Sequence, residues 1–537
     1  MRKKVQLFSL LSQLIFFFWI SVGSVAGQSA DTLSAADLQA MRIILNEEER
    51  QEFDRLTTLE EKREWARIYW KKRDPTPTTE KNERLEEFLR RLAHVRQWFR
   101  APGELGFDDR GRIYLRYGEP SERYIYPVGD MLVRPNESWS YSGIYNGLVF
   151  DFVARGSYYR LVDDLSQALV ARTEPGPEMM NLISLYESRA HLDPKYDRVA
   201  AELRRVMSVN FGEGETPTDP RNYAIGNINL ARLQLAELTG DLARIKSEAP
   251  RVVYRHDYKK KPLAIAHSLA RFRDQNGRVR VEIYFGIPYN QLKFEQIGRY
   301  WQAELRGGIA IFDEKYRRIK TDTLALQVMA PDLKATLKGA YISQFNFQLE
   351  PGQYHMALRI EHPAGNRLGI LRADFECPQY PADRLAMSDL QLSPKIVITY
   401  RNVPTDPANQ DRFTKHGLRI MPLPGLTIDR SRRLFVYFEI YNLGRNAEGK
   451  TRYEIEYALR ELEGKKSLVG RLFGGKKPVL AVTEVREGTE PNPTEYIGIE
   501  LHKQPEGKYM LEVTVRDQIK KEEARSAVPI RVTASRP

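Results

Sequence analysis

A long segment of the N-terminal part carries apolar side chains at helical spacing. From 34 to 99 these side chains recur three and four residues apart, with Glu and Arg on the other face. Thr58 and Glu61 stand three apart ahead of one apolar run, which is the spacing of a capping box that opens a helix. Asp74 precedes a proline and so ends that helix, and Thr76-Pro77 can begin the next one as cap and first-turn proline. This stretch is therefore predicted to be helical.

Further along, the apolar period changes from helical spacing to two. Alternation of apolar and polar residues predicts strands at 113–117, 148–153 and 158–162. We therefore predict that residues 30–165 form one helix-plus-sheet domain.

Helical spacing returns at 178–247. Leu203 and Val206 belong to one predicted helix, and several leucines between 230 and 238 belong to another. A break rich in Gly and Pro at 212–222 separates the two. We interpret this stretch as a helical connector.

From residue 251 onward the chain is predicted to consist of short strands, and part of the pattern occurs twice. Glu350–His362 (EPGQYHMALRIEH) matches Pro505–Asp517 (PEGKYMLEVTVRD) at an offset of 155 residues. The alternating apolar positions of 279–285 recur at the same offset in 434–440. A slip of one residue would turn each apolar face to water, so the shared parity indicates one fold used twice.

The repeated unit is predicted to be a β-sandwich of the immunoglobulin or fibronectin type III kind, because short alternating strands are joined by Gly and Asn turns. The two copies are expected at 251–377 and 388–534, joined by a proline-containing linker. Tyr354 and Tyr509 occupy equivalent positions. We expect each to bond a backbone group through its hydroxyl, in the manner of a tyrosine corner.

The N-terminus has the composition of an export signal. Basic residues at 2–4 precede an apolar core that is densest at 14–22, and small residues at 24–27 fit a cleavage site. We predict a signal peptide at 1–27 and a periplasmic or secreted mature protein that has no stable membrane span after cleavage. An uncleaved anchor is the alternative.

The net charge of the chain limits the classes of partner that we expect. The chain has 83 Lys and Arg against 71 Asp and Glu, a net charge of +12 that is modest for 537 residues. We expect no nucleic-acid partner, and the remaining classes are another envelope protein or an anionic envelope surface. The basic segment Lys465–Lys477 is a candidate loop for such a contact.

Cys377 is the only cysteine, so no internal disulfide can form, and we expect it to be a small buried apolar residue.

The N-terminal part also carries a series of short motifs. They are Tyr69-Trp70, RDPTP at 73–77, Asn82-Glu83, DRGRIY at 109–114, Tyr117-Gly118-x-Pro120, ESWxY at 137–141 and FxF at 150–152. This series resembles the GWxTD-domain family of exported bacterial proteins, over roughly residues 40–165. The namesake motif is degenerate, because LGFDD at 105–109 keeps only the aspartate. The resemblance implies an exported protein and the fold of its N-terminal module, and no particular reaction.

The best candidate functional cluster comes from these motifs. Its members are Trp70, Arg73, Asp74, Asn82, Asp109, Arg110, Tyr114 and Tyr117. In a functional interpretation, Asp74 and Asp109 form an acid/base pair in a sugar or peptide groove. In a structural interpretation, the two arginines tie a proline-broken loop to a turn through carboxylate hydrogen bonds, and the aromatic residues join the core. We favour the structural interpretation because nothing in the sequence brings the two carboxylates together.

Patterns typical of metal or serine chemistry are missing from the sequence. It contains no His-Glu-x-x-His and no Gly-x-Ser-x-Gly run, and a structural zinc would lack its cysteines. Gly470–Lys477 fits the spacing of a P-loop, but Lys477 replaces the Ser or Thr that would hold magnesium. We therefore predict no catalytic residue, no cofactor and no metal.

The predicted fold class is multi-domain α+β and all-β. It comprises an N-terminal helix-plus-sheet domain, a helical connector and two tandem immunoglobulin-like β-sandwiches. The predicted function is that of a non-enzymatic exported envelope protein that acts as a scaffold or binding module. The alternative is an envelope enzyme that hydrolyses cell-wall glycan or peptide, with its site in the N-terminal domain.

Overall fold

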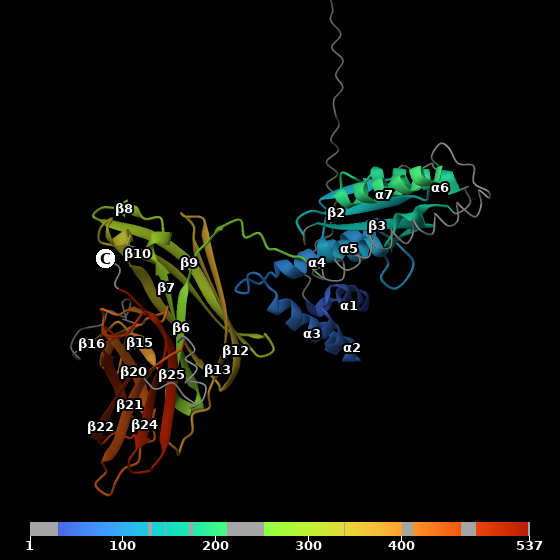
Figure 1. Ribbon diagram of the computed structural model, residues 1–537. Helices are drawn as coiled ribbons and strands as arrows, with labels where there is room; N and C mark the ends of the chain where they lie inside the picture. The colour runs from blue at the N-terminus through green and yellow to red at the C-terminus, as the bar shows by residue number, and fades with distance from the viewer. Residues whose placement is uncertain are drawn as a thin grey trace, which may run out of the picture. The chain divides into compact units, whose positions relative to one another are not determined.

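The computed structural model describes residues 30–126, 132–144, 147–170, 175–211, 252–337, 339–399, 412–462 and 479–534 (Figure 1). The chain divides into two compact units, Met1–Pro75 with Lys81–His256, and Thr76–Glu80 with Asp257–Pro537. The first is a helical region with a small sheet and the second is largely β, with several antiparallel sheets, so the coarse fold prediction is confirmed. The predicted signal peptide, the leucines at 230–238 and the basic segment at 465–477 lie outside the described residues.

The N-terminal unit begins with a series of helices, most of which follow a side chain that caps their first turn. They are η1 (Ala30–Thr32), α1 (Ala35–Met41), η2 (Arg42–Ile44), α2 (Glu47–Arg55), α3 (Leu59–Lys72), α4 (Glu83–Trp98) and α5 (Asp109–Tyr117). The predicted capping box is confirmed at the start of α3. The Glu61 amide donates to the Thr58 hydroxyl over 3.2 Å, and the Thr58 amide donates to the Glu61 carboxylate over 2.9 Å. Apolar side chains of these helices share one core.

Helix α4 begins after Asn82 rather than at Thr76-Pro77, so that part of the prediction is wrong. The Asn82 Oδ1 accepts the Leu85 amide at 3.0 Å, and its Nδ2 donates to the Trp70 carbonyl over 2.7 Å. Asn82 thus caps the new helix and also satisfies a carbonyl in the last turn of α3. Thr76 and Pro77 remain in the turn-rich link between the two helices.

Helix α5 occupies the segment that was expected to be a strand at 113–117, so the strand prediction is wrong. Asp108 caps the helix by accepting a backbone amide at 3.0 Å, and Gly118 ends it at a φ of 80°. The buried apolar residues of the helix are Ile113, Leu115 and Tyr117. Because this short helix is covered on more than one side, its apolar residues do not reveal the helical period.

A four-stranded antiparallel sheet follows in the order β1-β2-β3-β4. Its strands are β1 (Glu122–Ile125), β2 (Asn136–Tyr141), β3 (Leu148–Arg155) and β4 (Tyr158–Val162). The strands predicted at 148–153 and 158–162 are confirmed. Phe150 and Phe152 on one face of β3 join the core of α3, α4 and α5, whereas Val149 and Val153 join a second core.

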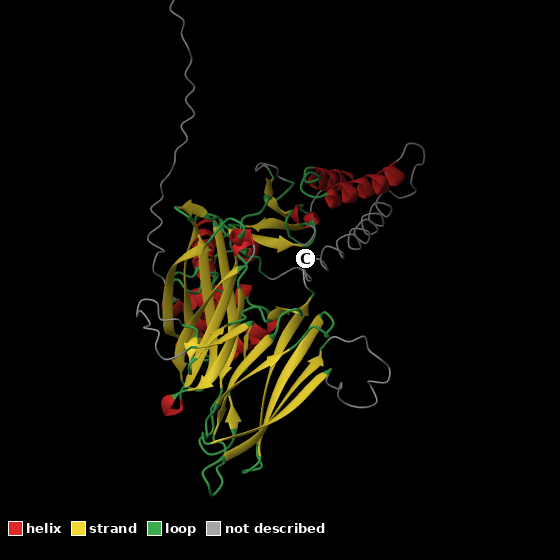
Figure 2. Ribbon diagram, turned by 90° about the vertical axis from the view of Figure 1, so that its left-hand side faces the viewer, coloured by secondary structure: helices red, strands yellow, loops and turns green. Residues whose placement is uncertain are grey.

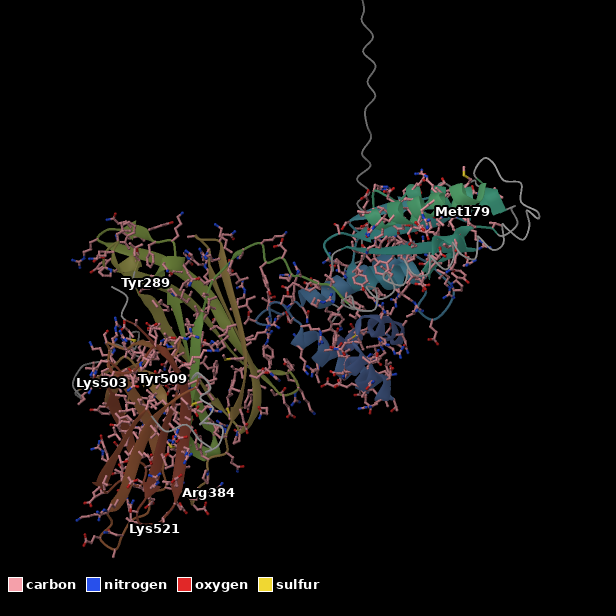
Figure 3. All side chains as sticks on the ribbon, viewed as in Figure 1. Met179, Tyr289, Arg384, Lys503, Tyr509 and Lys521 are labelled. Carbon is pink, nitrogen blue, oxygen red and sulfur yellow. The ribbon has the colours of Figure 1, made fainter. Side chains whose placement is uncertain are left out.

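The second core contains three further helices, η3 (Leu165–Ala168), α6 (Pro175–Glu187) and α7 (Pro194–Phe211). Met179 on α6, labelled in Figure 3, is one of its buried residues. A polar network reinforces the contact: the buried Arg189 donates to Ser138 over 2.7 Å, and Ser138 and Tyr196 donate to Asp151 over 2.5 and 2.7 Å. These helices therefore pack as part of the N-terminal unit.

The first β region of the C-terminal unit has two sheets around one core (Figure 2). Its strands are β5 (Lys261–Pro262), β6 (Ala266–Arg273), β7 (Val279–Pro288), β8 (Glu295–Ile297), β9 (Tyr300–Asp313), β10 (Arg318–Ala330), β11 (Ala340–Leu349), β12 (Gly352–His362) and β13 (Arg367–Cys377). One sheet has the order β10-β9-β12-β13-β5, with β8 also paired to β9, and the other has the order β11-β7-β6. Cys377 is buried in the shared core, as predicted.

The second β region has the same plan with one small sheet added. Its strands are β14 (Ala386–Met387), β15 (Gln391–Ser393), β16 (Lys395–Ile398), β17 (Thr414–Lys415), β18 (Leu418–Met421), β19 (Thr427–Asp429), β20 (Leu434–Tyr441), β21 (Thr451–Glu461), β22 (Leu480–Gly488), β23 (Thr494–Ile499), β24 (Gly507–Asp517) and β25 (Glu523–Thr533). The larger sheet has the order β22-β21-β24-β25-β19, and β20 pairs with β14, β15 and β23. The added sheet has the order β16-β18-β17.

Equivalent strands occupy equivalent places in the two regions. In both large sheets a short parallel strand closes one edge, β5 beside β13 and β19 beside β25. The Tyr354 hydroxyl donates to the Glu350 carbonyl over 2.8 Å, and the Tyr509 hydroxyl (Figure 3) donates to the Pro505 carbonyl over 2.8 Å. The expected hydroxyl-to-backbone bond is confirmed at both positions, 155 residues apart.

Candidate functional site

Arg110, at the start of α5, is the centre of a buried ion-pair cluster. Its guanidinium donates to the carboxylates of Asp108 and Glu137, each over 2.7 Å, and these carboxylates are 0% and 6% exposed. Glu137 also accepts the Trp139 indole N–H at 2.9 Å. Arg110 therefore links the cap of α5 to β2 through Asp108 and Glu137, and not through Asp109. Sequence reasoning missed Asp108 because it was considered only as a substitution in the degenerate namesake motif.

Asp109 joins α5 to the sheet by a separate contact. Its carboxylate accepts the Leu161 amide of β4 at 3.0 Å and lies 3.5 Å from the Arg112 guanidinium. A carboxylate in the first turn also interacts favourably with the helix dipole. These contacts give Asp109 a structural role at the helix terminus.

Four candidate residues gather at the link between α3 and α4, namely Trp70, Arg73, Asp74 and Asn82. Trp70 is 1% exposed and packs beside Phe88 with ring centroids 5.1 Å apart. Arg73 forms an ion pair with Glu49 and donates to a carbonyl of its own helix over 3.2 Å. Asp74 is fully buried. Together with the capping role of Asn82, these contacts stabilise the proline-broken link between two helices.

Tyr114 and Tyr117 belong to aromatic clusters in the same unit. Tyr114 stacks on His94, with ring centroids 4.4 Å apart and planes at 10°, and Tyr117 stacks on Phe150 at 5.4 Å. Burial raises the pKa of Tyr114 to about 12, with help from the charge of Glu119. The hydroxyl therefore stays protonated at neutral pH and provides no base there.

The eight candidate residues thus separate into groups with different contacts. Asp74 follows the last residues of α3, whereas Asp109 is the first residue of α5 and contacts β4. In the described part of the chain, no hydrogen bond or ion pair joins these two carboxylates. An acid/base pair has to reach one substrate from both sides. The contacts of these residues favour a structural interpretation of the motif.

A surface hollow of about 800 Å³ lies elsewhere in the N-terminal unit, beside α3. It is lined by Asp31, Leu56, Glu60, Glu61, Arg63, Glu64, Trp65 and Ile68. None of the candidate residues lines this hollow. Within the described ranges, no group of three or more His, Cys, Asp or Glu side chains is placed to hold a metal ion. No helix in those ranges combines the length and the apolar character needed to cross a membrane.

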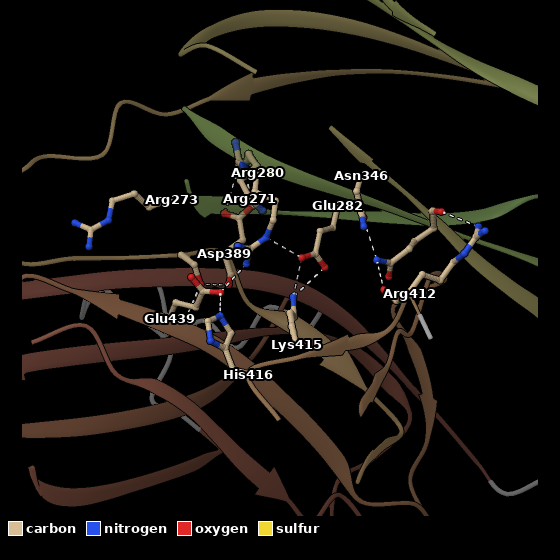
Figure 4. A network of polar contacts seen from close by, with 12 residues as sticks. Arg271, Arg273, Arg280, Glu282, Asn346, Asp389, Arg412, Lys415, His416 and Glu439 are labelled. Carbon is tan, nitrogen blue, oxygen red and sulfur yellow. Dashed lines mark hydrogen bonds and ion pairs between the residues drawn. The ribbon is translucent and has the colours of Figure 1, made fainter. Parts of the chain in front are cut away.

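A buried charged network joins the two β regions of the C-terminal unit (Figure 4). Arg280 on β7 contacts Glu282 on the same strand at 3.1 Å and Glu439 on β20 at 2.7 Å. Lys415 on β17 donates to both carboxylate oxygens of Glu282, over 3.0 and 2.9 Å. The Glu282 and Glu439 side chains are 5% and 7% exposed, so water screens these contacts little. Charges from both β regions thus neutralise one another at one junction.

Aromatic rings enclose the lysine of this network. The Lys415 Nζ lies 3.8 Å from the centroid of the Phe272 ring and 4.7 Å from that of Tyr437. Burial lowers the pKa of Lys415 to about 8, although the charge of Glu282 opposes the shift. Such a lysine is held in place by its carboxylate partner and by cation–π contacts on two sides.

Glu439 is held as a carboxylate by its surroundings. Burial alone would raise its pKa, but the hydrogen bond from His416 and the charge of Arg280, together with Tyr441 and Lys415, outweigh burial and lower the pKa to about 2. The carboxylate therefore remains ionised across the physiological range. The size of the shift indicates how strongly the network stabilises this charge.

The repeat explains how the network is built. At the offset of 155 residues, Glu282 falls on Tyr437 and Tyr284 falls on Glu439. Each tyrosine donates to the glutamate of its own strand, over 2.7 and 3.1 Å. Equivalent faces of β7 and β20 therefore meet at the junction with their Glu and Tyr positions exchanged. The signal that could have revealed this is the aromatic and acidic character of the strand face that points away from the repeat core.

Further contacts surround the network. Arg271 on β6 contacts the Asp389 carboxylate at 2.6 Å, and the Asp389 amide donates to the Arg271 carbonyl over 3.1 Å. The Arg273 amide donates to the Tyr441 hydroxyl over 2.9 Å. Six buried apolar or aromatic residues from both regions complete the junction: Ala270, Phe272, Tyr284, Leu418, Ile420 and Tyr437. The junction therefore combines an apolar core with charge pairs, like the interior of a single domain.

Comparisons with known proteins do not identify the chain. No family model matches it. No curated protein matches it. Similar solved structures include trypsin-activated alpha-2-macroglobulin from Escherichia coli, at 9% identity over 52% of this chain and 17% of that chain with a TM-score of 0.16. They also include the same protein activated by porcine elastase, at 8% identity over 53% and 23% with a TM-score of 0.15.

A third similar structure is the C-terminal domain of the AgI/II polypeptide BspA from Streptococcus agalactiae. It shares 9% identity over 50% of this chain and 100% of that chain, with a TM-score of 0.14. At such TM-scores these similarities assign neither a detailed fold nor a function to this chain.

Proposed function

We propose that this protein is a non-enzymatic exported envelope protein whose C-terminal unit acts as a stiff scaffold or binding module. The observation that carries the proposal is the buried network of Arg280, Glu282, Lys415 and Glu439 between the two β regions. Domains within one chain move relative to one another by default unless their interface is large and well packed. Buried charges with partners on both sides oppose such motion, because separation would have to break every pair.

We infer further that each β region is an immunoglobulin-like β-sandwich, with the two copies at 251–377 and 388–534. Support comes from two sheets around one core in each region, the shared strand order and the bonds of Tyr354 and Tyr509. Sandwiches of this kind display loops on a rigid frame, which suits recognition.

The N-terminal unit is proposed to be a GWxTD-like module with a structural role. Its motif residues cap helices, pair with buried carboxylates and fill the aromatic core, which supports a framework rather than a reaction centre. The signal peptide at 1–27 is proposed to direct the chain to the periplasm or beyond. There, the partner classes are another envelope protein or an anionic envelope surface.

The test compares the mature full chain with its Asp109→Asn variant. Both are incubated with purified peptidoglycan and with peptide substrates, and both are melted. The proposal predicts no release of soluble glycan or peptide by either protein. Turnover by the parent protein that the variant loses, with no change in melting temperature, would establish the enzyme alternative instead.

A further inference from the structure

Strand β10, at the edge of the larger sheet in the first β region, carries a segment without the residue types that usually protect a sheet edge. Thr323–Met329 (TLALQVM) contains no charged residue, no proline and no glycine. Among the described strands, none pairs with the outer edge of β10. Free edges expose backbone donors and acceptors that recruit other strands, so natural proteins usually place charges, prolines or bulges there. A segment of this kind is an exception to that practice.

The equivalent edge in the second β region has the usual protection. Leu358 on β12 and Val513 on β24 are equivalent by the offset of 155. Leu358 pairs with Ile309 of β9, which pairs in turn with Asp322 of β10. Val513 pairs with Tyr457 of β21, which pairs in turn with Val482 of β22, so Asp322 and Val482 are equivalent edge positions. That register gives three equivalent pairs on the two edges: Leu324 and Glu484, Leu326 and Arg486, Gln327 and Glu487. The edge strand β22 of the second region thus has charged residues at positions where β10 of the first region has none. The uncharged edge is therefore a property of the β10 sequence and is not required by the repeated fold.

The core side of β10 is incompletely covered. Leu324 and Leu326 pack against the core of the first region but remain partly exposed, and Met329 on the opposite face is 46% exposed. A strand added beside β10 would cover both leucines and would pair the free backbone groups.

We propose that β10 pairs in antiparallel fashion with β10 of a second copy of this chain, which makes one sheet continuous across a symmetric dimer. This inference does not depend on the proposed function. A two-fold pairing centred on Leu326 places Thr323 opposite Met329 and Lys320 opposite Asp332, because each of these number pairs is centred on 326. Opposite charges therefore meet at both ends of the pairing, and no like charges face one another between them.

The proposal is tested by sedimentation velocity of the mature full chain from low to high micromolar concentration. The parent protein should show a concentration-dependent dimer. Ala325→Lys with Gln327→Lys places lysines opposite one another across the pairing, and should weaken the dimer by roughly tenfold or more. Both substituted side chains are exposed, so the fold should survive, and circular dichroism checks it.

Two further variants make the assignment specific. Val485→Lys with Glu487→Lys, at the equivalent places on β22, should leave the dimer unchanged. Ala325→Glu with Gln327→Glu should dissociate alone but dimerise when mixed with the lysine variant, because opposite charges then face one another. A monomeric parent protein, equal dissociation by the β22 variant, or a mixture that stays monomeric would each overturn the proposal. A parent protein that does not dimerise and pairs only with an added foreign peptide would also overturn the proposal.

Discussion

Replacing Glu439 by glutamine removes one charge from the centre of the junction and keeps the size of the side chain. Glu439 contacts Arg280 at 2.7 Å and His416 at 3.4 Å, and it accepts the Tyr441 hydroxyl at 2.9 Å. These partners help lower its pKa from 4.5 to about 2. A shift of this size corresponds to about 3 kcal/mol of preference for the charged form in the folded protein. The variant should therefore destabilise the junction by about 3 kcal/mol.

The same magnitude predicts a pH dependence with a definite sign. Because the folded pKa is depressed, the stabilisation is present above pH 4.5 and is lost as the pH falls from 4.5 towards about 2. The glutamine variant has no proton to bind at this position, so it should lose this part of the acid dependence.

Hydrogen-exchange mass spectrometry measures the effect locally, on peptides from β6, β7 and β17. The variant should raise the opening equilibrium of these peptides roughly a hundredfold at neutral pH and leave the helices of the N-terminal unit unchanged. Glu500→Gln is the matched control, because Glu500 forms an exposed pair with Arg433 that should contribute less than about 1 kcal/mol. Equal exchange in the Glu439 variant and the parent protein would show that this charge does not stabilise the junction, and so would an equal effect of the control.

Three other predictions concern the Arg110 cluster, the two tyrosine bonds and the export signal. Asp108→Ala removes one of the two carboxylates that contact the buried Arg110 guanidinium and should lower the free energy of unfolding by about 3 kcal/mol. Asp109→Ala should lower it by about 1 kcal/mol. Denaturant unfolding followed by tryptophan fluorescence measures both, and the reverse order would contradict Asp108 as the partner of Arg110. Tyr354→Phe and Tyr509→Phe should each cost about 1 kcal/mol, measured by exchange in their own strands, and clearly unequal losses would argue against equivalent roles. Mass spectrometry of the native protein should find a start near Gly27, and an intact N-terminus on a membrane-bound product would exclude the cleaved signal.

The sequence predicted those features of the fold well that depend on a single local pattern. The capping box at Thr58 and the bonds of Tyr354 and Tyr509 depend on short-range spacing and on strand parity, and both are read from the chain directly. The prediction of a strand at 113–117 was wrong, because a short helix that is covered on several sides shows no clear helical period in its apolar residues.

The junction could not be predicted because it depends on contacts between distant segments. Arg280 and Glu439 are 159 residues apart, and Lys415 comes from a small sheet that the first region lacks. In the N-terminal motif series, the sequence contained both Arg110 and Glu137 but did not pair them, since 27 residues and the strand β1 separate them. Spacing along the chain reveals caps and faces, and it does not reveal which charges meet across a core.

The proposed scaffold requires the two β regions to form one rigid body, and double electron–electron resonance tests this requirement most directly. Spin labels at Ala364→Cys, in the turn between β12 and β13, and at Glu448→Cys, in the loop between β20 and β21, occupy exposed positions on the two regions, while the native Cys377 is buried. At neutral pH the full chain should give one narrow distance distribution, and adding Glu439→Gln should broaden it. A broad distribution with the network intact would contradict the rigid scaffold.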